Sequence, residues 1–77
     1  MNPSVATSLN NLAGVYHKLG HFDRAIALYR SAFEIRKLVL GEVHDETLIV
    51  EENLKVVMND KKKWAAVTNS GLLLKKN

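Results

Sequence analysis

The fold is decided by residues 5–41, VATSLNNLAGVYHKLGHFDRAIALYRSAFEIRKLVLG, which hold two long apolar runs with one glycine between them. Apolar side chains recur in each run every three to four residues, which is the spacing of an amphipathic α-helix. Gly20 and Gly41 each follow such a run, where a residue with positive φ ends a helix without strain. The stretch therefore predicts an antiparallel hairpin of two helices, over residues 4–19 and 22–40.

The two predicted helices differ in the width of their apolar surface. The first carries one apolar face, made of Val5, Leu9, Leu12, Ala13, Tyr16 and Leu19. Roughly opposite lies a face of small and polar residues, namely Thr7, Asn10, Asn11, Gly14 and Lys18. The second helix is apolar around much of its circumference, so we expect it to pack against a neighbour on each side.

The C-terminal half repeats the first half in weaker form. Its spacing predicts a third helix over residues 45–59 and a fourth over residues 62–73, the latter interrupted by the poor helix formers at 69–71. At an offset of 42 residues the two halves share matching pairs: Asn11 with Asn53, Leu12 with Leu54, Val15 with Val57, and Phe22 with Trp64. Two tandem helical hairpins have the pattern of a slice of an α-solenoid, which normally needs at least three units for a stable stack.

The residue pattern of the first unit resembles that of a known repeat family. The stretch from Val5 to Ala13, followed by Tyr16, Gly20, Phe22, Ala25, Leu28-Tyr29, Ala32, Glu34-Ile35-Arg36, Val39-Leu40-Gly41 and His44, resembles a tetratricopeptide repeat. More narrowly, it resembles the 42-residue version found in kinesin light chains, because the second helix runs on through residues 37–40. The resemblance implies an all-α fold of antiparallel helix-turn-helix hairpins stacked as a short tetratricopeptide solenoid.

Small and large residues in the first unit suit close helix packing. We expect structural roles for Leu12, Ala13, Tyr16, Gly20, Phe22, Ala25, Tyr29 and Ala32. The second unit departs from the pattern, since Lys55, Lys62 and Gly71 stand where Ala13, Gly20 and Tyr29 stand in the first. We therefore interpret residues 1–77 as one domain, with a well-matched repeat at 3–41 and a degenerate second repeat or terminal cap at 42–77.

The resemblance also implies a binding face. Tetratricopeptide stacks bind extended peptides in a concave groove lined by the first helix of each unit, where an asparagine hydrogen-bonds the peptide backbone. Asn11 and Asn53 match that asparagine, and an amide donates and accepts at once. The expected peptide-binding neighbours are Asn10, Thr7, His17, Lys18 and Glu52. The alternative interpretation is a pair of solvated or helix-capping asparagines.

Composition removes several other classes of function. The chain has 77 residues, no cysteine and a net charge of +3, so it offers one domain, no disulfide and no thiolate metal site. The charge alternates along the chain, and Lys61–Lys63 lack the aromatic residues of a nucleic-acid surface, so we interpret them as a solvated turn. His17 and His21 have metal-ligand spacing, but Gly20 separates them, and we expect two exposed turn histidines. We expect His44 to make a contact at the start of the third helix.

The sequence predicts a non-enzymatic protein with no cofactor. It contains no nucleophile elbow, phosphate loop or zinc-binding His-Glu-X-X-His motif. The N-terminus lacks a signal-peptide layout and no apolar run reaches membrane-spanning length, so we expect a cytoplasmic protein. The predicted function is a scaffold or adaptor that binds a protein or peptide partner. The alternative is a self-assembly or solenoid-capping module, whose apolar helix faces pair with copies of itself, as a homo-oligomer, or with further repeats.

Overall fold

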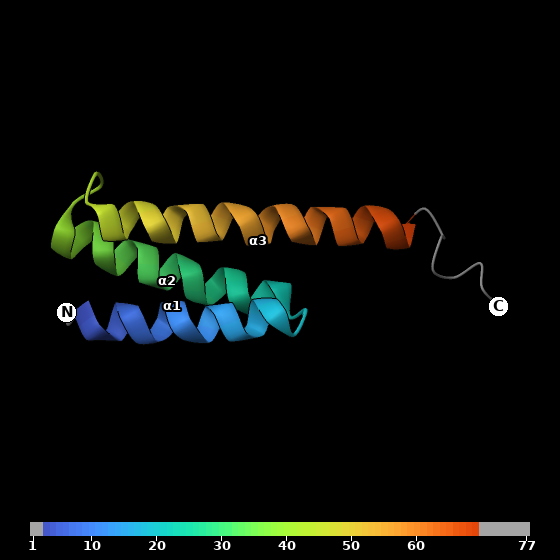
Figure 1. Ribbon diagram of the computed structural model, residues 1–77, viewed down its shortest axis with the longest axis horizontal. Helices are drawn as coiled ribbons and strands as arrows, with labels where there is room; N and C mark the ends of the chain where they lie inside the picture. The colour runs from blue at the N-terminus through green and yellow to red at the C-terminus, as the bar shows by residue number, and fades with distance from the viewer. Residues whose placement is uncertain (1–2, 70–77) are drawn as a thin grey trace.

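The computed structural model describes residues 3–69, which form three helices joined by two short connections: α1 (Pro3–Lys18), α2 (Phe22–Leu40) and α3 (Asp45–Asn69). Figure 1 shows that α1 and α2 form an antiparallel hairpin and that α3 lies along α2, running in the direction of α1. The described part of the chain contains no strand. The predicted all-α fold with an antiparallel hairpin is confirmed.

Two glycines end the helices as predicted. Gly20 has φ +82° and Gly41 has φ +97°, values that side chains with a Cβ atom rarely adopt. After α1, the Gly20 N–H donates to the His17 carbonyl at 3.0 Å and the His21 N–H donates to the Tyr16 carbonyl at 2.9 Å. These two bonds form a Schellman motif, which satisfies carbonyls that the end of α1 leaves free.

The core is built from alanines that let the helices approach closely. Its buried residues are Ala6, Ala13, Ala25, Ala32, Tyr29, Val50 and Val57, spread over all three helices. Burial among the helices raises the pKa of the Tyr29 phenol, because removal from water disfavours the charged phenolate. The broad apolar surface of α2 is explained by its place between α1 and α3, as the sequence predicted.

One buried charge joins the three helices. Arg36, only 6% exposed, donates from Nη1 to the Glu46 carbonyl oxygen at 3.1 Å and from Nη2 to Thr7 Oγ1 at 3.2 Å. The Glu46 carboxylate lies 3.8 Å from the same guanidinium. A buried cation is destabilising unless it is paired and hydrogen-bonded, and Arg36 in α2 meets both conditions through α1 and α3.

The predicted break between a third and a fourth helix is wrong. α3 continues without interruption from Asp45 to Asn69, through the position where Lys62 replaces the glycine of the first turn. Lysine has good helix propensity and does not favour the positive φ of a helix end, so the helix does not stop there. The predicted fourth-helix residues beyond 69 lie outside the described residues.

The first helix packs differently from the prediction at Leu12. This residue was expected in the core, but its side chain is 45% exposed. The apolar face of α1 is wider than the contact with one neighbouring helix, so only the part around Ala13 is buried. Trp64, the sequence counterpart of Phe22, is likewise 53% exposed.

Candidate functional site

The polar face of α1 lies beside α3, and side-chain bonds join the two helices. Asn53 Nδ2 donates to Asn10 Oδ1 at 3.2 Å, and His17 Nε2 lies 2.7 Å from Asp60 Oδ2. Both pairs are 43 residues apart, and on each helix they are separated by seven residues. The two parallel helices therefore keep one register over two turns.

The predicted binding residues divide into bonded and exposed groups. Thr7 accepts the hydrogen bond from Arg36, and Asn10, His17 and Asn53 make the bridges to the neighbouring helix. The structure thus pairs Asn53 with Asn10, one residue before its sequence counterpart Asn11. Asn11, Lys18 and Glu52 are exposed to solvent.

His17 is not the exposed turn histidine that the sequence indicated. It is the second-to-last residue of α1, it is half-buried, and its ring meets the edge of Phe22 with centroids 6.0 Å apart. His21 instead packs its ring against Tyr16, at 5.9 Å. The sequence analysis missed Asp60 as the partner of His17, because no local pattern connects residues so far apart in the chain.

The prediction for His44 is confirmed. The backbone N–H of Glu46, in the first turn of α3, donates to His44 Nδ1 at 3.1 Å. The first N–H groups of a helix have no partner within the helix, and this ring nitrogen satisfies one of them.

A hollow of about 400 Å³ lies where α3 passes the end of α1. It is lined by His17, Lys18, Gly20, Phe22, Asp60, Lys63, Trp64 and Val67. The lining combines two lysines with two large aromatic side chains, and the exposed Trp64 forms part of its wall on α3. This hollow continues the polar face of α1 toward the C-terminal half of α3.

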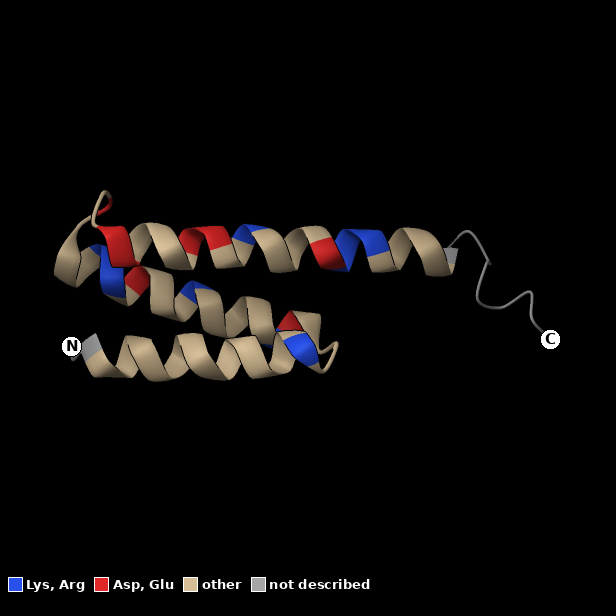
Figure 2. Cartoon of the chain, viewed as in Figure 1, with Lys and Arg blue, Asp and Glu red and all other residues tan. Residues whose placement is uncertain are grey.

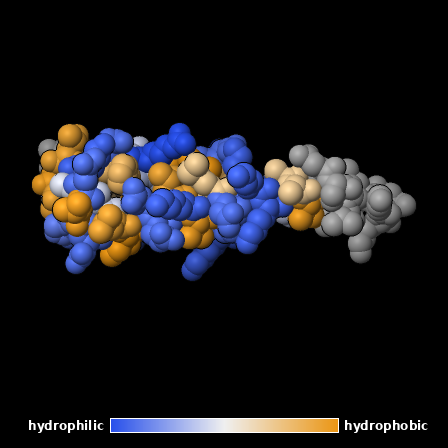
Figure 3. Space-filling view, turned by 90° about the horizontal axis from the view of Figure 1, so that it is seen from above, coloured by the Kyte–Doolittle hydropathy of each residue, from blue (hydrophilic) through white to orange (hydrophobic). Residues whose placement is uncertain are grey.

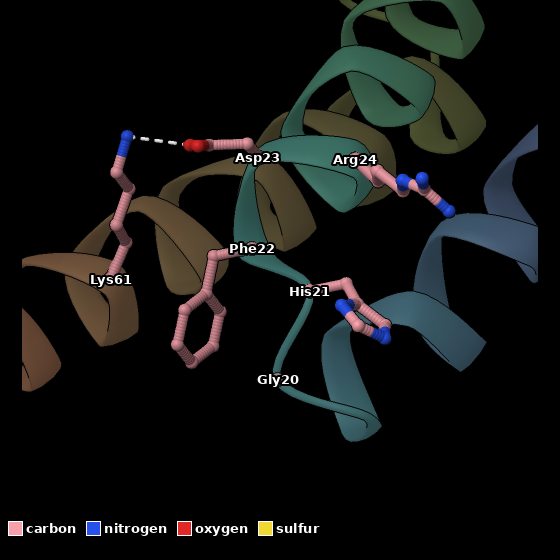
Figure 4. Close-up of a pocket in the computed structure, with 6 residues that line it drawn as sticks. All are labelled: Gly20, His21, Phe22, Asp23, Arg24 and Lys61. Atoms are coloured by element: carbon pink, nitrogen blue, oxygen red, sulfur yellow. Dashed lines mark ion pairs between the residues drawn. The ribbon is translucent and has the colours of Figure 1, made fainter.

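A second hollow, of about 340 Å³, lies at the start of α2 (Figure 4). Lys61 Nζ contacts Asp23 Oδ1 at 2.6 Å, so these two opposite charges neutralise each other. Figure 4 shows Arg24 and His21 extending away from this pair, toward α1. The Arg24 guanidinium lies 5.6 Å from the centroid of the Tyr16 ring, within cation–π distance. Lys61–Lys63 belong to α3, so the turn predicted there is wrong, whereas their predicted exposure to solvent is confirmed.

Part of the apolar face predicted for the first helix stays exposed, together with Val15, and runs along α1. We call it the open stripe: Val5, Leu12, Val15 and Leu19, which are 47%, 45%, 52% and 64% exposed. Beside it, a hollow of about 320 Å³ is lined by Leu12, Tyr16, Arg24, Ala27 and Leu28. The stripe and the buried part of α1 are both apolar, and they differ only in whether α2 covers them. Hydropathy alone therefore does not distinguish them.

Within residues 3–69, no three histidine, cysteine or acidic side chains gather into a cluster suited to a metal ion. Among the described helices, none is both long and apolar enough to cross a membrane.

Comparison with known proteins identifies the family of the hairpin. The family model described as tetratricopeptide repeat matches residues 5–46, which cover most of α1, all of α2 and the start of α3. No curated protein and no solved structure matches the chain at a significant level. Because the matched segment is more than half of the chain, the chain belongs to the tetratricopeptide repeat family, whose members are protein–protein interaction modules.

Proposed function

We propose that the chain is a scaffold or adaptor that binds an extended peptide segment of a protein partner along the line where α1 and α3 meet. Asn11 and the Asn10–Asn53 pair are the proposed backbone-binding groups, with Lys18 and Glu52 as charged neighbours. The narrower kinesin-light-chain type of repeat and a cytoplasmic location form part of the same proposal.

The observation that carries this proposal is the Asn10–Asn53 bridge. The bridge uses Asn53 Nδ2 and Asn10 Oδ1, so Asn53 Oδ1 and Asn10 Nδ2 have no further bond among the described residues. The exposed Asn11 adds a complete amide directly beside them. A peptide backbone offers one N–H and one C=O per residue, and these amides supply the complementary acceptor and donor.

A peptide library displayed on phage and selected against the chain supplies the ligand for a test. Asn11→Ala is expected to weaken binding of the selected peptide by about five- to a hundredfold, because peptide groups are left without partners. Ser31→Ala is the matched control, since Ser31 is also an exposed polar residue in a helix but lies on α2, outside the proposed face. Equal effects of the two substitutions would contradict the proposal.

A second candidate function is that of an assembly or capping module, favoured by the difference between two helix flanks. α1 carries Ala6, Asn10, Ala13 and His17 along the side that α3 covers. At the offset of 42 residues, α3 carries Leu48, Glu52, Lys55 and Asn59, all exposed, which we call the outer flank. Figure 3, which looks down on the molecule from the side of α3, shows mainly hydrophilic residues over its middle part.

The outer flank lacks the small residues that close packing needs. Both alanines of α1 are fully buried, whereas their counterparts Leu48 and Lys55 are large and exposed. A further helix placed there would meet a lysine in the position of Ala13, and burying an unpaired ammonium is strongly unfavourable. These contrasts support a terminal cap at the α3 side and leave the open stripe of α1 as the surface for assembly.

Thermal unfolding followed from micromolar to millimolar chain concentration tests the assembly role. A module that associates is expected to melt at a higher temperature as its concentration rises. A melting temperature independent of concentration, and unchanged by an added helix that fits the open stripe, would contradict it.

A further inference from the structure

We propose that α1 is a homotypic docking helix, whose open stripe pairs antiparallel with the open stripe of a second copy of this chain. The inference rests on the assembly role proposed above and specifies its surface, its occupant and its orientation.

The internal repeat shows that the open stripe is a face built for a helix. On α3, the stripe made of Thr47, Val50, Leu54 and Val57 is buried or half-buried against the hairpin. At the offset of 42 residues they correspond to Val5, Ser8, Leu12 and Val15 on α1. The same face of the equivalent helix is thus covered in one half of the molecule and exposed in the other.

The spacing of the stripe suits a helix pair. Residues 5, 8, 12, 15 and 19 alternate steps of three and four, which is the a/d pattern of a coiled-coil seam. Val, Leu, Val and Leu occupy four of these positions, and Ser8 is the one small polar residue.

The charge of α1 favours a copy of itself over a charged partner. The helix has no charged residue from Pro3 to Tyr16, and Figure 2 shows it tan, the colour of uncharged residues, along most of its length. α1 itself offers no group to a partner selected by opposite charge and no like-charge repulsion to a second copy. Arg24 of α2, which lines the adjoining hollow, lies over the Tyr16 ring. Lys18 lies at the C-terminal end, so antiparallel pairing places the two lysines at opposite ends and parallel pairing places them side by side.

Antiparallel pairing also places the small Ser8 opposite the large Leu12. With the two-fold axis midway along α1, Val5 faces Val15 of the second copy and Ser8 faces Leu12 of the second copy. The hollow beside Leu12, walled by Tyr16 and Leu28, adds apolar surface from the hairpin. Every contact is repeated by the two-fold axis, as an isologous interface requires.

The size of the surface sets the expected strength. α1 has 16 residues and is therefore about 24 Å long, so one helix face buries an area at the low end of specific interfaces. The dimer is expected to be weak, with dissociation in the micromolar range.

Sedimentation equilibrium on the whole chain tests the proposal. We expect a reversible dimer that Val15→Glu weakens by about a hundredfold or more, since two carboxylates per dimer would have to enter an apolar contact. Val43→Glu is the matched control, because Val43 is 85% exposed in the α2–α3 connection and carries the same change of charge. Circular dichroism checks that both variants keep the parent helicity.

Cysteine crosslinking tests the orientation, because the chain has no cysteine of its own. V5C and V15C chains, one of them isotopically labelled, are mixed and oxidised. We expect the disulfide between unlike chains to exceed those between like chains. Predominant V15C–V15C products would indicate parallel pairing and overturn the proposed orientation.

The remaining outcomes separate this inference from the assembly role. A dimer that Val15→Glu leaves intact overturns the surface proposed here while the assembly role stands. A chain that stays monomeric at millimolar concentration overturns the homotypic pairing. If that monomer is stabilised by a synthetic peptide of residues 22–40, a helix of the α2 type occupies the stripe instead; if it is not, both proposals fail.

Discussion

Replacement of Gly14 by alanine is expected to stabilise the protein. Gly14 lies in the interior of α1, where glycine is less favourable than alanine by about 1 kcal/mol. A Cβ atom built at this position has the Tyr29 hydroxyl as its nearest neighbour, at 3.6 Å, which is an ordinary van der Waals contact. The new methyl group therefore fits without moving α2, and the helix-propensity gain remains.

The same substitution at Gly20 is expected to have the opposite sign. A Cβ at Gly20 meets no atom within 4 Å, but the residue holds φ +82°, a conformation that alanine adopts with a cost of about 1–2 kcal/mol. The pair thus separates helix propensity from turn geometry with one chemical change, the addition of a methyl group.

Thermal melts followed by circular dichroism measure both effects. For a domain of this size, 1 kcal/mol corresponds to about 4–8 °C in melting temperature, so Gly14→Ala should raise it and Gly20→Ala should lower it by comparable amounts. Destabilisation by Gly14→Ala would refute the close but unstrained approach of α1 to Tyr29. Stabilisation by Gly20→Ala would refute the Schellman end of α1.

Three further predictions concern the core and are checked by equilibrium unfolding. Ala25→Glu should abolish the cooperative fold, because Ala25 is fully buried and an unpaired carboxylate there costs several kcal/mol; a parent-like helicity and melt would contradict the packing of the hairpin. Thr47→Val should stabilise by about 1–3 kcal/mol, because the buried Thr47 hydroxyl has no hydrogen-bond partner in the described structure; a loss of stability would mean that the hydroxyl is bonded. Burial raises the pKa of the Tyr29 phenol, so its contribution to folding stability is complete below the unfolded pKa of about 10 and is lost as pH rises through the folded pKa. Tyr29→Phe should therefore lose less stability at alkaline pH than the parent does, and equal losses would count against a buried phenol.

The sequence predicted the features that depend on local chemistry. Gly20 and Gly41 marked the ends of α1 and α2, because positive φ is a property of the residue itself. The alternation of Ala25, Tyr29 and Ala32 predicted the buried face of α2 for a similar reason, since helical periodicity fixes which residues share a face.

The features that failed depend on contacts between distant segments. The repeat suggested a turn near Lys62, but the structure has one continuous helix there. In this degenerate unit the residues have good helix propensity, and the side chains of Asp60 and Lys61 bond to the hairpin from the helix. The exposure of Leu12 likewise follows from where α2 lies, which periodicity in α1 does not specify. In the candidate site, the offset of 42 residues paired Asn11 with Asn53, whereas the packed helices pair Asn53 with Asn10.

The most direct test of the proposed function is the affinity of the parent and the Asn11→Ala variant for the same selected peptide, measured by calorimetric titration with thermal melts alongside. The account predicts affinity lower by about five- to a hundredfold at an unchanged or slightly higher melting temperature, because Asn11 is exposed and alanine is the better helix former. Equal affinity with equal melting would contradict the asparagine contact and favour the assembly role. Lower affinity together with a lower melting temperature would show that Asn11 is a structural residue.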